Sequence, residues 1–90
     1  MAELADAVEE FLDNIVNLIK NGIGGSLKNS EANTLKEWAK TYAGIEDLDF
    51  TRTAEGLQLS EQSAIALYVA LKKVDSVKAS LVFDELSESL

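Results

Sequence analysis

The sequence contains no cysteine, no histidine and no proline, and Arg52 is its one arginine. Without cysteine, a disulfide framework and a thiolate metal site are both excluded. Without histidine, the chain lacks the commonest general acid–base group and metal ligand. No serine stands beside a candidate base either. We therefore expect no catalytic residue, no cofactor and no metal site, and a protein that is not an enzyme.

Long apolar runs are also lacking, since none approaches the roughly 18–20 residues that a membrane span needs. The N-terminal segment carries several acids, which is the opposite of the basic start of a secretory signal. We expect a cytoplasmic protein with no membrane partner. Its 90 residues are enough for one core, because single domains usually span on the order of 100–150 residues. Residues 1–90 are therefore predicted to form a single helical domain.

Basic residues are scarce, and the formal net charge is −8. This excess of acid opposes binding to phosphate backbones, which depends on Lys and Arg, so nucleic acid is not an expected partner. Acids recur at three- and four-residue steps in the first segment, which places them on one face of a helix. This acidic face, suited to a basic protein partner, comprises Glu3, Asp6, Glu10 and Asp13.

The first half of the chain predicts two helices joined by a glycine-rich connector over residues 22–26. Apolar residues at helical spacing, Phe11 among them, predict a helix over residues 2–21 that ends at Asn21-Gly22. A second helix is predicted over residues 31–43, capped by Ser30 or Asn29. Its apolar face contains Leu35, Trp38 and Tyr42, and we expect Trp38 to belong to the core.

Residues 45–58 give the weakest pattern. Apolar spacing allows a short helix that ends at Gly56, and Leu57–Leu59 then looks extended. Ser60 is predicted to cap the helix that follows, with Leu59 packing on Ala64.

From Ser60 to Leu86 the chain forms either one helix or two. Lys72 and Lys73 suit a helix end, and Asp75 suits a new N-cap. Against a break, neither glycine nor proline interrupts the run, and one apolar seam continues across Asp75. We favour one long helix and predict that its seam is a homodimer interface, formed by Leu67, Ala70, Val74, Val77 and Leu81. A second stripe, facing another way, consists of Ala79, Val82, Phe83 and Leu86.

About half of the chain resembles the Cro/repressor-type helix-turn-helix family. The resemblance rests on Trp38-Ala39, Ala43-Gly44-Ile45, Phe50-Thr51-Arg52, Glu55-Gly56 and Leu59-Ser60 leading into residues 65–74. It implies a recognition helix that ends near Arg52, the only residue there able to pair with guanine or phosphate. That helix would also carry Glu46, Asp47 and Asp49, and these acids would repel the phosphates of the DNA groove that the helix should enter.

The sequence thus predicts an all-α fold, a small bundle of four helices, or five if the last segment divides, with a long C-terminal helix. For function, it favours a non-enzymatic protein–protein interaction or regulatory module that acts through helical surfaces as a homodimer. The alternatives are a Cro/repressor-like helix-turn-helix domain, DNA-binding or degenerate, and an acidic inhibitor that mimics nucleic acid.

Overall fold

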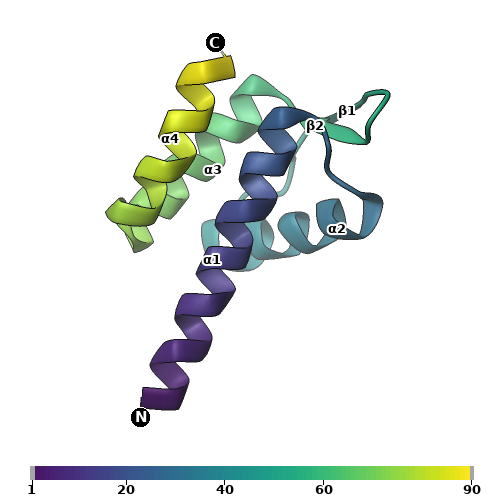
Figure 1. The fold of residues 1–90 in the computed structure, drawn as a ribbon. Helices are drawn as coiled ribbons and strands as arrows, with labels where there is room; N and C mark the ends of the chain where they lie inside the picture. The colour runs from purple at the N-terminus through teal and green to yellow at the C-terminus, as the bar shows by residue number, and fades with distance from the viewer. Residues whose placement is uncertain (1, 90) are drawn as a thin grey trace.

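The computed structural model describes residues 2–89, and the side chains of residues 11–88. In chain order, the elements are α1 (Ala2–Gly24), α2 (Asn29–Trp38), a π-helical turn η1 (Ala39–Ala43), β1 (Phe50–Arg52), β2 (Leu57–Leu59), α3 (Glu61–Val74) and α4 (Ser76–Ser89). Helices α1, α3 and α4 pack alongside one another, while α2 crosses α1 (Figure 1). The two strands form a small hairpin at the end of α1 (Figure 1). The fold is predominantly helical, but it is not purely α.

Helix α1 is confirmed, but it ends three residues later than predicted, at Gly24. Gly25 then adopts a positive φ of 83°, and the Ser26 N–H donates to the Asn21 carbonyl at 3.0 Å. Gly22 lies inside the helix, and its missing side chain makes room for Leu59. A Cβ at Gly22 would lie 2.7 Å from the Leu59 Cδ1.

Helix α2 begins earlier than predicted, and its cap is neither Ser30 nor Asn29. Lys28 is the N-cap, and its backbone N–H donates to the Glu31 side chain at 3.0 Å. The helix then widens into η1 before Gly44 ends it with a φ of 68°. The predicted end at Gly44 is confirmed.

The prediction of a short helix that ends at Gly56 is wrong, because β1 occupies the centre of this segment. The first turn of α3 holds this segment extended: the Asp49 N–H donates to Ser63 Oγ at 2.8 Å, and the Asp49 carbonyl accepts the Ser60 N–H at 3.0 Å. Phe50, Thr51 and Arg52 then pair antiparallel with β2. Gly56 is needed in the turn, since a Cβ there would lie 2.6 Å from the Leu27 carbonyl oxygen.

The extended conformation predicted for Leu57–Leu59 is confirmed, because these residues form β2. A further antiparallel bridge joins Leu57 to Leu27, directly after α1. Ser60 caps α3 as predicted, its side chain accepting the Ser63 N–H at 3.2 Å.

The prediction of a single long C-terminal helix is also wrong, because the segment forms two helices, α3 and α4. Asp75 is extended, with φ −154° and ψ 100°, and its backbone N–H still donates to the Leu71 carbonyl at 2.8 Å. Its carboxylate accepts the N–H groups of Val77 and Lys78, each at 3.1 Å, so it caps the next helix. One aspartate therefore ends α3 and starts α4, and α4 folds back against α3 and α1 (Figure 1).

The core lies between α1 and the α3–α4 hairpin, and it extends under α2. Trp38 is buried, as predicted. Phe11 and Tyr42, which the apolar spacing assigned to the same core, remain 43% and 67% exposed. The buried residues of the hairpin of helices are Ser63, Ala64, Leu67, Leu71, Ala79, Val82 and Leu86.

Candidate interaction surfaces

The five residues of the predicted interface lie on two helices and differ in how far they are buried. Leu67 is fully buried in the core and Ala70 is partly buried. Val74, Val77 and Leu81 are exposed, Val77 most of all at 74%. Val77 and Leu81 lie beyond the break at Asp75, on α4. Leu67, Ala70 and Val74 all belong to α3, and Val74 is exposed at the end of that helix.

Helices α3 and α4 carry most of the exposed large hydrophobic side chains. Of the eight among residues 11–88, six belong to α3 or α4. We call these six together the outer face, a set defined by exposure: Ile65, Val69, Val74, Val77, Leu81 and Phe83. The rings of Tyr68 and Phe83, 5.7 Å apart between centroids, connect the two helices. Exposed apolar patches of this kind mark interaction sites more often than isolated residues do.

Half of the outer face was not part of the predicted interface, namely Ile65, Val69 and Phe83. Phe83 was predicted to share a stripe with Ala79, Val82 and Leu86, but these three are buried and Phe83 is half exposed. The sequence signal for these exposed pairs is a four-residue spacing, which joins Ile65 to Val69 and Val77 to Leu81. Each pair lies on one side of its own helix, and this becomes visible only when the two helices are treated separately.

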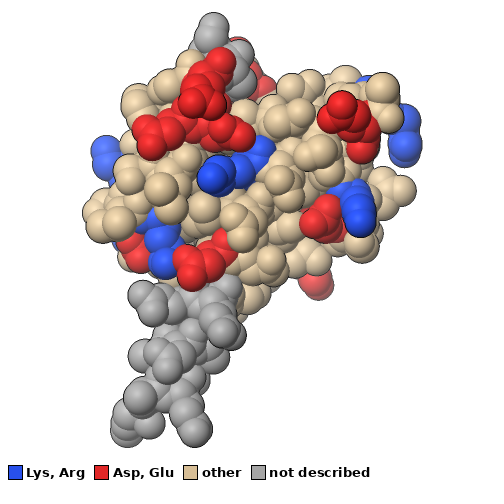
Figure 2. Space-filling view, viewed as in Figure 1, with Lys and Arg blue, Asp and Glu red and all other residues tan. Residues whose placement is uncertain are grey.

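Opposite charges lie at the two ends of the hairpin. Lys72 and Lys73 are exposed at the closed end, beside the turn at Asp75. The open end carries Glu61, Asp84, Glu85 and Glu88, and Figure 2 shows acidic side chains gathered over the C-terminal part of α4. None of these four carboxylates forms an ion pair within the part of the chain that the structure describes.

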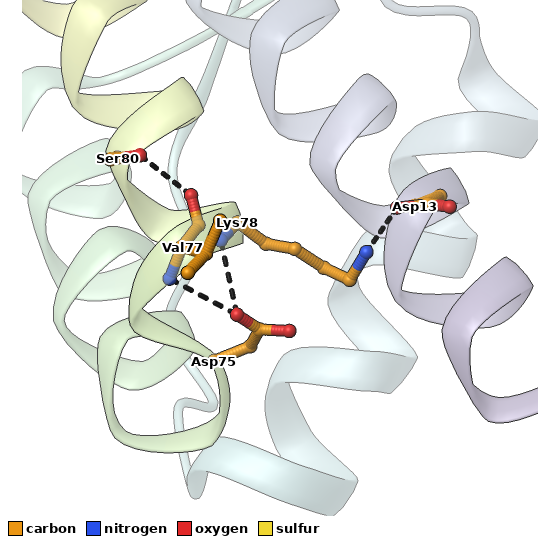
Figure 3. Close-up of polar contacts among 5 residues, drawn as sticks. All are labelled: Asp13, Asp75, Val77, Lys78 and Ser80. Carbon is orange, nitrogen blue, oxygen red and sulfur yellow. Dashed lines mark hydrogen bonds and ion pairs between the residues drawn. The ribbon is translucent and has the colours of Figure 1, made fainter. Parts of the chain in front are cut away.

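Of the predicted acidic face, only Asp13 has a described side chain; those of Glu3, Asp6 and Glu10 lie outside the described residues. The Asp13 carboxylate is paired with the ammonium group of Lys78 (Figure 3). The Lys78 side chain is 14% exposed and that of Asp13 is 61% exposed. Asp13 therefore connects α1 to α4 within one chain.

The helix-turn-helix resemblance does not extend to the recognition helix. Residues 44–49 form no helix, and Phe50–Arg52 is β1. Arg52 is exposed on a strand of a hairpin, so no helix presents it to a groove.

The described residues include no group of three or more Asp and Glu side chains placed to hold a metal ion. Every buried side-chain nitrogen or oxygen atom among them has a hydrogen-bond partner. Within the described part of the chain, no helix is both long and apolar enough to cross a membrane.

Comparisons with protein-family models, with curated proteins and with solved structures found no match to this chain.

Proposed function

We propose that this chain is a non-enzymatic protein-interaction module, and that its outer face pairs with the outer face of a second copy. The observation that carries this proposal is the concentration of exposed hydrophobic side chains on one hairpin of helices. Covering them in a dimer would remove apolar area from water, which contributes roughly 25 cal/mol for each Å² buried.

The charges of the hairpin favour a second copy as the occupant of the outer face. In a twofold symmetric dimer the same patch serves both partners. If the two hairpins lie antiparallel, Lys72 and Lys73 of one copy meet the acids at the open end of the other. A parallel arrangement would instead bring like charges together. The charge pattern is therefore complementary to itself in one orientation only.

The end of α4 also favours a basic neighbour. A helix C-terminus carries partial negative charge, which disfavours nearby acids. Glu85 and Glu88 lie in or beside the last turn of α4, where no basic residue accompanies them. Lysines from a second copy would offset this unfavourable interaction.

The test is the mass of the full chain at micromolar concentration, measured by light scattering. We expect a dimer, and we expect Val77→Glu to give a folded monomer, because a charge would then lie within the apolar contact. Asn33→Glu is the matched control: it adds the same charge at an exposed position on α2 and should leave the dimer intact. A monomeric unmodified chain contradicts the proposal.

Charge reversal tests the antiparallel orientation. Lys72→Glu with Lys73→Glu should weaken the dimer, as should Asp84→Lys with Glu88→Lys. Mixing the two variants should restore pairing as a heterodimer. If both variants dimerise as well as the unmodified chain, the antiparallel orientation is wrong.

A further inference from the structure

A second surface, separate from the outer face, lies between α1 and α2. It is an open groove of about 250 Å³. The groove is lined by Phe11, Thr34, Glu37, Trp38, Thr41 and Tyr42. The only two exposed large hydrophobic side chains that do not belong to the α3–α4 hairpin, among residues 11–88, are Phe11 and Tyr42.

Three aromatic rings form the apolar part of the groove. The Tyr42 ring lies 6.2 Å from the Phe11 ring, edge to face at 62°, and 6.3 Å from the Trp38 ring, tilted at 35°. Trp38 is buried and anchors the cluster, whereas the other two rings are open to solvent. Accessible ring faces attract cations, since the face of an aromatic ring carries partial negative charge.

The π-helical turn η1 places Tyr42 at the groove. Its wider turn adds a residue relative to an α-helix, and such turns are frequent at functional sites. The Ile45 N–H donates to the Ala39 carbonyl at 3.0 Å, and Ala39 is buried. Tyr42 is thus held at the surface by a backbone that is anchored on both sides.

Among the residues whose side chains are described, Glu37 is the only charged one that lines the groove. The Lys36 ammonium group lies over the Phe50 ring, 5.3 Å from its centroid, so it is directed toward the β-hairpin.

We propose that this groove binds a lysine or arginine side chain from a basic segment of a partner protein. The cation would lie against the faces of Tyr42 and Phe11 and pair with the Glu37 carboxylate. The aliphatic part of the same side chain would cover the apolar floor. This site extends the interaction function to a second surface, and its residues take no part in the dimer contact.

The experiment titrates the full chain with a hexalysine peptide and follows the fluorescence of Trp38, the sole tryptophan. We expect saturable binding, and no response to an uncharged peptide of the same length. Tyr42→Ala should raise the Kd about 3- to 10-fold, and Glu37→Gln about 3-fold. Both side chains are exposed, so the fold should persist; circular dichroism checks this.

Glu55→Gln is the matched control, because it removes the same charge at an exposed position in the β-hairpin turn. It should change the Kd less than 2-fold, as expected for a charge that contacts no ligand. An equal loss in Glu37→Gln and Glu55→Gln would mean that the peptide responds only to net charge, and it would overturn the proposal. Absence of binding would do the same. Repeating the titration with Val77→Glu separates this site from the dimer, since we expect an unchanged Kd there.

Discussion

The inner and outer faces of the α3–α4 hairpin are built from the same kinds of residue and differ in what covers them. Leu71 on the inner face is fully buried, and Leu81 on the outer face is 48% exposed. Both are leucines in regular helix. Composition therefore does not distinguish a buried residue from an exposed one in this hairpin. The side of its own helix on which each residue lies does.

The largest expected effect comes from truncating one leucine on each face. Leu71→Ala should lower the free energy of unfolding by about 2–5 kcal/mol, because it leaves a cavity in the core. Leu81→Ala should cost less than about 1 kcal/mol, since its surroundings are largely solvent. Urea unfolding measures both, in the Val77→Glu background so that dimerisation does not contribute. Equal losses would show that the two faces are not distinct.

An intermediate effect is expected at the residue that separates the two helices of the hairpin. Asp75→Ala removes the carboxylate that accepts the Val77 and Lys78 N–H groups, and should cost about 0.5–2 kcal/mol of stability. Glu46→Ala, at an exposed position in the loop before β1, is the control and should stay within about 0.5 kcal/mol. The same unfolding experiment applies. A neutral Asp75→Ala would show that packing alone maintains the turn.

The smallest effect concerns the ion pair at the border between α4 and α1. Asp13→Asn should lower the free energy of unfolding by about 0.2–1 kcal/mol, since the Asp13 side chain is largely exposed. Added salt should reduce the difference from the unmodified chain. Asp47→Asn, exposed in the loop before β1, provides the control and should show no such difference. A loss that salt does not change would mean that the pair acts through packing.

The features that could be predicted from the sequence are those with a local cause. The cap at Ser60 and the buried Trp38 follow from residues within one or two turns of the site. So does the end of the second helix, because Gly44 supplies a left-handed residue.

The features that were missed depend on distant partners. β1 forms because Asp49 hydrogen-bonds to the start of α3, 14 residues further along the chain. Gly22 lies within α1, where the absence of a side chain leaves space for Leu59, 37 residues further along the chain. The break at Asp75 had local evidence in its capping carboxylate, but the apolar spacing favoured continuity.

The contacts of the β-hairpin also bear on the order in which the molecule folds. The Thr53 hydroxyl donates to the Gly25 carbonyl at 2.7 Å, and the Gln58 amide donates to the Ile23 carbonyl at 3.2 Å. These bonds join residues 28 and 35 positions apart, whereas α3 and α4 are separated by a single residue. Closing a longer loop costs more chain entropy before any contact is gained. The two C-terminal helices can therefore associate first, and the hairpin fastens the end of α1 in a later step.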